Sequence, residues 1–216
     1  MPKISDQKRQ ARRLQILDAA TRCFARDGFH RTSMEDIVRE SGLSPGAIYC
    51  YFRGKHEIVE AISAERHARD SALLAEFLSS PNIGEALKSV SRALVVMLSE
   101  PKEKERRKVS IQFWAESLLD RRVRKIAERG IRQRDRLTVA LRDAQQSGEL
   151  AGSVDVDAVS RVMLALLQGL ILQQAWEPEL DIEGYVTTAV GLLGAALAGS
   201  KPGLHRRNRR EPSDAG

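Results

Sequence analysis

The chain has 216 residues, enough for one large or two small domains, and 42% of them are hydrophobic, which is ample for a packed core. No apolar run is long and charge-free enough to span a bilayer, because Arg161 and Glu177 closely flank the most apolar stretch, and the basic N-terminus lacks the apolar segment of a secretory signal. We therefore expect a cytoplasmic protein with no membrane partner, in which Cys23 and Cys50 stay reduced.

The net charge of +6 is concentrated at the two ends of the chain. Residues 1–55 have 11 Lys and Arg against 6 Asp and Glu, residues 56–200 have 19 against 21, and residues 201–216 have 5 against 2. A basic N-terminal module suits a polyanion such as nucleic acid. A merely solvated basic surface is the alternative that charge alone leaves open.

Apolar residues recur at helical spacing along the chain, and clusters of Gly, Pro and Ser separate the periodic stretches. This pattern predicts an all-α fold of about nine helices. The expected helices span about 7–27, 33–41, 44–51, 55–79, 82–100, 104–119, 120–146, 155–176 and 182–198. Residues 201–216 have almost no apolar content, so we expect a disordered basic tail there.

Residues 32–52, TSMEDIVRESGLSPGAIYCYF, are the most informative segment. Ser33 and Asp36 form an S-x-x-D pattern that caps one short helix, and Gly42 supplies the turn after it. The next helix begins with small residues, which would let it approach a DNA duplex closely, and its free N–H groups favour phosphate. These small residues are Ser44, Pro45, Gly46 and Ala47. The segment therefore predicts a helix-turn-helix that binds DNA.

Two tyrosines, Tyr49 and Tyr51, continue this second helix and have hydroxyls that can contact phosphates or base edges. We assign Ile48 to the core together with Phe52, and we expect both tyrosines to face DNA, with core packing as the alternative. Met34 has the same two interpretations.

The stretch TSMEDIVRESGLSPGAIYCYFRGK, from Thr32 to Lys55, resembles the signature of the TetR family of transcriptional regulators, and Ile16 to Phe29 resembles the family's first helix. The similarity covers most of residues 10–70. It combines a capped helix, a turn glycine and a Y-x-Y-F-x-x-K ending at fixed spacing. The resemblance implies DNA-facing positions at Thr32, Ser33, Met34, Ser44, Gly46, Tyr49, Tyr51 and Lys55.

The same resemblance implies a domain organisation and a function. It predicts a DNA-binding domain at 1–55, an effector-binding and dimerisation domain at 56–200, and the tail at 201–216. The implied function is repression by a homodimer that binds a palindromic operator in double-stranded DNA and is released by a small-molecule effector. Activation through the same DNA-binding module is the alternative.

Two short motifs, FWAES at 113–117 and SGEL at 147–150, resemble the C-terminal domain of a TetR subtype related to choline-responsive repressors. We expect an effector cavity between the middle helices, lined by Met97, Trp114, Glu116, Met163, Gln168 and Gln174. Trp114 and Met163 would also suit a plain core. Glu116 would either neutralise a cationic ligand or pair with an arginine, and the sequence does not choose.

A dimer seam is expected because one helix-turn-helix reads only a few base pairs, whereas a two-fold dimer reads two half-sites. The last two helices are the candidates, as a four-helix interface. The expected seam residues are Val162, Leu166, Gly169, Leu170, Gln173, Val186, Ala189, Val190, Leu193 and Leu197. The alternative is that the same apolar stripes form the core of a monomer.

Catalysis is not expected. The four histidines are scattered without metal-ligand spacing, and the sequence contains no nucleophile-elbow, phosphate-loop or dinucleotide motif, so we expect neither a metal nor a cofactor. The remaining alternative is a helical adaptor that binds another protein through the same aromatic residues.

Overall fold

The computed structural model describes residues 6–198, except for the side chains of residues 129, 130, 131 and 133. Within this range the chain forms nine helices and no strand, which confirms the all-α fold. The helices are α1 (Asp6–Asp27), α2 (Met34–Ser41), α3 (Pro45–Tyr49), α4 (Lys55–Ser79), α5 (Ile83–Leu98), α6 (Glu103–Leu119), α7 (Arg121–Gln146), α8 (Val156–Trp176) and α9 (Ile182–Leu197). Each expected helix is present within about two residues of its predicted ends. The tail expected at 201–216 lies outside the described residues.

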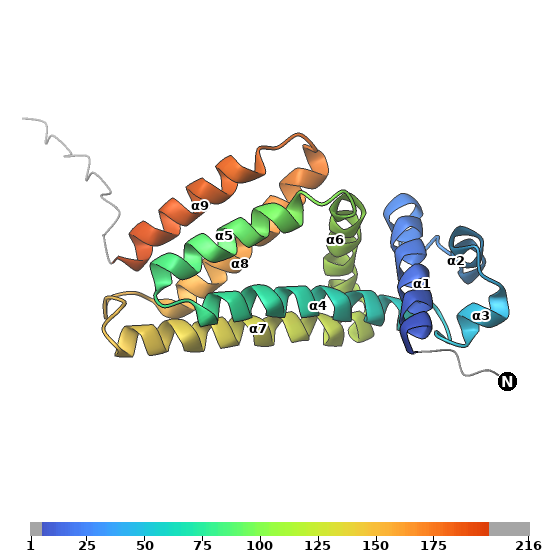
Figure 1. Ribbon diagram of the computed structural model, residues 1–216, viewed down its shortest axis with the longest axis horizontal. Helices are drawn as coiled ribbons and strands as arrows, with labels where there is room; N and C mark the ends of the chain where they lie inside the picture. The colour runs from blue at the N-terminus through green and yellow to red at the C-terminus, as the bar shows by residue number, and fades with distance from the viewer. Residues whose placement is uncertain (1–5, 199–216) are drawn as a thin grey trace, which may run out of the picture.

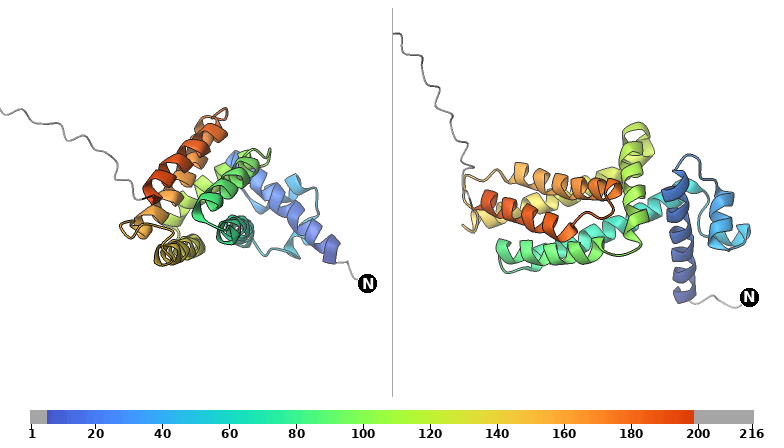
Figure 2. Two further views of the ribbon diagram at one scale, coloured as in Figure 1. Left: turned by 60° about the vertical axis from the view of Figure 1, so that its left-hand side comes forward. Right: turned by 90° about the horizontal axis from the view of Figure 1, so that it is seen from above.

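The helices divide the molecule into two ends, as Figure 1 shows. Helices α1, α2 and α3 gather at one end, and α5, α8 and α9 gather at the other with most of α7. The long helix α4 runs from the first group into the second, and α6 stands across it next to α1 (Figures 1 and 2). We call the first group the head, and the second group together with α6 the body.

Local side-chain chemistry sets the ends of the head helices. The Ser33 hydroxyl accepts a hydrogen bond from the Asp36 N–H at 3.1 Å, and the Asp36 carboxylate accepts one from the Ser33 N–H at 2.9 Å, so the predicted capping box is present. Gly28 and Gly42 have φ values of +86° and +67°, a backbone conformation that suits glycine and ends α1 and α2. The Ser44 hydroxyl caps α3 by accepting from the Ala47 N–H at 3.3 Å.

Head and body have separate apolar cores. The head core draws on α1 to α4 and includes the fully buried Cys23. Its buried members are Ile16, Leu17, Ala20, Cys23, Phe24, Ile37, Ile48, Phe52, Ile58 and Ala61. The body core draws on α4, α5, α7, α8 and α9 and buries Phe77, Ala86, Leu87, Leu141, Leu150, Val156, Leu193 and Leu197.

Four of the ten residues expected at a dimer seam are instead buried inside this single chain, so that part of the expectation is wrong. Leu193 and Leu197 belong to the body core, and Leu170 and Val186 form a smaller cluster with Leu98 of α5. The reason is that α8 and α9 pack against each other and α9 also packs along α5. A helical apolar stripe predicts burial but not which neighbour provides it.

Helix α8 is, among the described helices, the one long and apolar enough to cross a membrane by length and composition. Only 17% of its most apolar window is buried within the chain. Its outer side exposes Val162 and Trp176, which are 50% and 70% exposed, and the neighbouring outer side of α9 exposes Leu192 at 64%. This outer face of α8 and α9 is thus an apolar surface that the chain itself does not cover.

Replacing Ser33 with alanine should lower the free energy of unfolding by about 1 kcal/mol, because α2 loses the acceptor at its first turn. Urea unfolding monitored by circular dichroism measures this. The control is Ser153→Ala, at an exposed turn serine before α8, which should change stability within error. Equal losses in the two variants would contradict the capping role.

Candidate nucleic-acid interface

Helix α3 has five residues and depends on its neighbours for its shape, because a helix this short is not stable alone. Ile48 is fully buried in the head core, and Phe52, just beyond the helix, is also buried there. Burial of an isoleucine side chain contributes roughly 1.5–3 kcal/mol. Because this side of α3 is held inward, the opposite side must face solvent.

The solvent-facing side of α3 carries the small residues that the sequence singled out. Ser44, Pro45 and Gly46 are exposed, and Ala47 is half-buried. One turn further along, Tyr49 is 50% exposed. A helix surface of small residues beside one half-exposed tyrosine can approach a DNA major groove closely.

Three further residues expected at DNA are half-buried. Met34 and Tyr51 pack against the head core, so each has one side in the core and the other in solvent. Ser33 is half-buried and its hydroxyl is engaged in the capping box. Core packing of Met34 and Tyr51 is therefore present in part, and their contact with DNA stays a prediction.

Thr32 was expected to face DNA, and the structure contradicts this. Its side chain is only 1% exposed, and its hydroxyl donates a hydrogen bond to the Gly28 carbonyl at 2.8 Å. Its N–H also donates to the Gly28 carbonyl, at 3.2 Å. Thr32 closes the turn between α1 and α2, and none of its polar hydrogens is left for a phosphate.

Lys55 was also expected to reach a phosphate, but its ammonium group is occupied inside the head. Nζ donates to the carbonyl oxygens of Phe29, Thr32 and His30 at 2.6, 2.9 and 3.3 Å, which uses all three of its donors. Nζ also lies 4.6 Å from the centre of the Phe29 ring. Burial lowers the pKa of Lys55, and nearby Glu116 partly opposes that shift. Lys55 thus fixes the loop that leads into α2.

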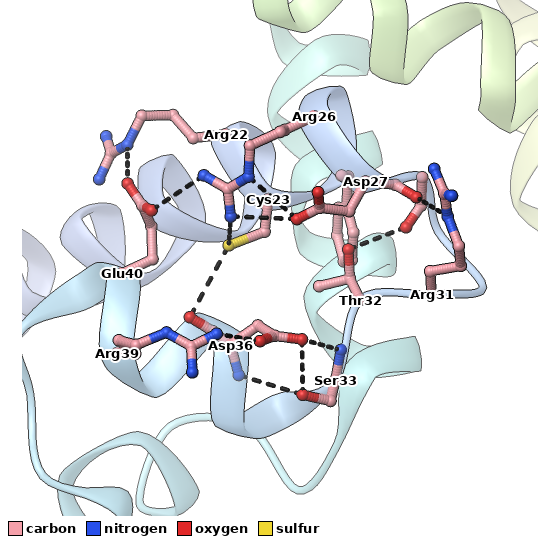
Figure 3. Close-up of polar contacts among 12 residues, drawn as sticks. Arg22, Cys23, Arg26, Asp27, Arg31, Thr32, Ser33, Asp36, Arg39 and Glu40 are labelled. Carbon is pink, nitrogen blue, oxygen red and sulfur yellow. Dashed lines mark hydrogen bonds and ion pairs between the residues drawn. The ribbon is translucent and has the colours of Figure 1, made fainter.

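A set of ion pairs orients α2 against α1 (Figure 3). Glu40 of α2 accepts from Arg22 at 2.6 Å and from Arg26 at 3.3 Å, both on α1, and these hydrogen bonds lower the pKa of Glu40. Asp36 accepts from Ser33 and also pairs with Arg39, and the bonds from Ser33 lower its pKa. The arginines of these pairs are exposed, so the pairs add little stability, and the two pairs of Glu40 serve mainly to orient α2 against α1.

Helix α6 of the body is tied to the head by contacts that the sequence did not indicate. The Gln112 amide donates from Nε2 to the Phe24 carbonyl at 3.0 Å and accepts at Oε1 from the Phe29 N–H at 3.1 Å. Glu116, one turn later, lies 2.8 Å from the His30 ring nitrogen. Glu116 therefore pairs with a histidine, which was neither of the two roles expected for it. The partners are more than 80 residues apart, so no local pattern could have identified them.

The six residues expected around an effector cavity do not meet in one place. Glu116 lines a cavity of about 60 Å³ between α1, α4 and α6, and the other five do not. Met97 packs with the Leu98 cluster, Met163 packs on the body core, and Trp114 packs beside Phe113. Gln168 is half-buried and Gln174 is buried in α8. The structure therefore does not bring the six together, because periodicity along one helix does not show which neighbouring helix each side chain meets.

Comparison with known families gives two matches that together cover most of the chain. Residues 16–62 match the family described as "Bacterial regulatory proteins, tetR family". Residues 85–209, more than half of the chain, match the "BetI-type transcriptional repressor, C-terminal" family.

Individual relatives are similar to this chain over nearly their whole length. The transcriptional regulator TtgR of Pseudomonas putida is 28% identical over 219 residues, which cover 89% of this chain and 96% of TtgR. The structure of Salmonella enterica GusR is similar with a TM-score of 0.71, at 27% identity and with 91% and 99% of the two chains covered. The complex of SmeT with triclosan has a TM-score of 0.74, at 29% identity and with 87% and 91% covered. SmeT is the repressor of a Stenotrophomonas maltophilia multidrug efflux pump.

Replacing Lys55 with methionine should lower the free energy of unfolding by about 1.5–3 kcal/mol, because three carbonyls of the loop lose a charged donor. Urea unfolding measures the change. The matched control is Lys88→Met, which removes an exposed lysine of α5 that pairs with Glu85 of the same helix α5. This variant should lower the free energy of unfolding by about 0.5 kcal/mol or less. If the Lys55 variant were as stable as the control, the structural role of Lys55 would be refuted.

Proposed function

The chain belongs to the TetR family of bacterial regulatory proteins and is a transcriptional regulator, not an enzyme, and from that premise we propose that it is a repressor that binds a palindromic operator as a homodimer. A small-molecule effector releases it from DNA. It acts in the cytoplasm, where its operator is. Residues 1–55 form the DNA-binding domain, and residues 56–200 form the effector-binding and dimerisation domain.

The observation that carries this proposal is the outward face of α3. Its small residues and Tyr49 project into solvent, while Ile48 and Phe52 on the other side hold the helix on the head core. A recognition helix needs both properties, because its position must be fixed while its surface enters the groove. Within the proposal, Ser44, Pro45, Gly46 and Tyr49 face DNA directly, and Ser33, Met34, Ala47 and Tyr51 flank them.

The uncovered face of α8 and α9 supports the homodimer. Val162, Trp176 and Leu192 would each lose apolar exposure against a second copy of the same face. A two-fold axis through this face makes the interface isologous, with the same residues contributed by both copies. In this proposal the seam consists of Val162, Leu166, Gly169, Gln173, Ala189 and Val190 from the predicted set, together with Trp176 and Leu192. The high apolar content of α8 is then explained, because one side of the helix packs within its own chain and the opposite side packs against the second copy.

Effector release follows from an equilibrium between two arrangements of the heads. An effector that binds one arrangement more tightly moves the population toward it, and operator DNA must prefer the other. The effector therefore lowers the affinity for operator DNA by the same factor by which operator DNA lowers the affinity for the effector. A transcription assay on the bound promoter separates repression from activation.

Replacing Gly46 with glutamate should weaken operator binding by about 100-fold or more, because it places a carboxylate against the phosphate backbone. A Cβ atom at Gly46 meets no atom within 4 Å, so the fold should tolerate the change. Fluorescence polarisation with a labelled palindrome from the DNA upstream of the gene measures the affinity, which should also fall steeply with added salt.

The matched control for this measurement is Gly152→Glu. It makes the same charge change at an exposed glycine before α8 that also has open space around it. This variant should bind the operator like the unmodified protein. Equal affinities for all three proteins would rule out α3 as the DNA-reading helix.

Replacing Leu192 with glutamate should convert the dimer into a 24.0 kDa monomer, because two carboxylates would face each other near the two-fold axis. Sedimentation equilibrium measures the mass. The control is Leu119→Glu, at a leucine of α6 that is even more exposed, and this variant should remain dimeric. A Leu192 variant that stays dimeric would place the seam elsewhere.

A further inference from the structure

The cavity lies between α1 of the head and the helices α4 and α6. Three aromatic rings line it, with Phe24 and Phe29 on the head side and Phe113 on α6. Aliphatic side chains complete the apolar lining, namely Leu17, Val59, Ile62, Val109 and Val123. Six charged side chains also line it: Asp18, Glu65, Arg66, Arg69, Arg106 and Glu116.

Four of these six charges have a partner of opposite charge at hydrogen-bond distance, and a fifth, Glu116, lies at hydrogen-bond distance from the His30 ring. The pairs are Asp18 with Lys102, Glu65 with Arg13, Arg69 and Arg106 with Glu103, and Glu116 with His30. The three carboxylates of the wall are therefore satisfied within the protein. The sixth charge is Arg66, which has no carboxylate at hydrogen-bond distance among the described residues.

Arg66 is a largely buried cation with weak compensation. Its nearest carboxylate oxygen, Oδ2 of Asp70, is 4.0 Å from Nε, and Nε is buried without a hydrogen-bond partner among the described residues. Burial raises the pKa of Asp70, which disfavours the charge that would neutralise Arg66. The guanidinium lies 5.1 Å from the centre of the Phe113 ring and 5.9 Å from that of Trp114. A largely buried cation with weak compensation is costly, so this position favours an anion.

We propose that this cavity is the effector site and that the effector is a small aromatic carboxylate, whose acid group pairs with Arg66. The inference rests on the regulatory function proposed above and adds the location and chemical class of the effector. Arginine recognises carboxylates through paired N–H donors, and the phenylalanines of the wall suit an aromatic body. A cationic ligand fits poorly, because each wall carboxylate is already paired.

The size of the cavity connects binding to DNA release. The cavity is small, with a volume of about 60 Å³, so in this proposal an aromatic acid widens it. Widening separates α1 from α4 and α6, and α1 carries the α2–α3 pair through the head core. The ligand therefore binds an arrangement with a displaced head better than the closed one, as an effector must.

Three ligands of nearly the same shape and different charge test the site: benzoate, benzamide and benzamidine. Titration calorimetry at about pH 7.5, where a carboxylate is ionised, should show benzoate binding at least about 10-fold more tightly than the other two. Arg66→Met should weaken benzoate binding about 10- to 100-fold. Arg92→Met, at an exposed arginine of α5, should leave it unchanged.

A second variant tests the cavity itself. Ser110→Leu places a larger apolar side chain on the α6 wall and should abolish benzoate binding without removing a charge. Urea unfolding establishes that both variants are folded. Benzoate should also weaken operator binding by the unmodified protein and have no such effect on Arg66→Met.

The proposal is overturned if no probe binds the unmodified protein, if benzamide or benzamidine binds as tightly as benzoate, or if Arg66→Met binds benzoate normally. Benzoate binding that leaves operator affinity unchanged would also overturn the effector assignment. Failure of the proposed function looks different, because a protein that binds no operator in the absence of any probe fails before benzoate is added.

Discussion

The position of α3 depends on the burial of Ile48, and the DNA-binding arrangement depends on α3. A five-residue helix has too few internal hydrogen bonds to persist alone, so the head core decides both its existence and its direction. Phe52 gives the same segment a second anchor immediately after the helix. With both side chains held inward, small residues and Tyr49 are left on the outer side. One packing constraint thus produces a rigid helix with an open surface.

The head is held to the body by α4, which runs through both, and by polar contacts of α6. The amide of Gln112 bonds to two backbone groups of the head, and Glu116 pairs with His30. The Lys55 ammonium group donates hydrogen bonds to three carbonyl oxygens of the loop between α1 and α2. These ties lie beside the cavity that contains Arg66, so a change in the cavity acts directly on the contacts that set the head's orientation. Coupling between distant sites requires such a shared element with two arrangements.

Local features of the sequence predicted the helices and the outward face of α3 well. Capping by Ser33 and the turn at Gly42 are decided within a few residues, so the sequence contains the necessary information. Contacts between distant segments were not predictable in this way. Lys55 is bound by carbonyls 23 to 26 residues earlier, and the burial of Leu170 depends on how α8 packs against its neighbours. Periodicity identifies an apolar stripe, but only the packed structure shows which neighbour covers it.

The central claim is that two copies present their α3 helices together to one duplex. Cys50 is exposed beside α3 and Cys23 is buried, so a nitroxide label can be attached at Cys50 alone. Double electron–electron resonance on the labelled protein bound to its operator should give a main distance of roughly 35 Å, one helical turn of DNA. Absence of any dipolar signal, with or without the operator, would contradict the account.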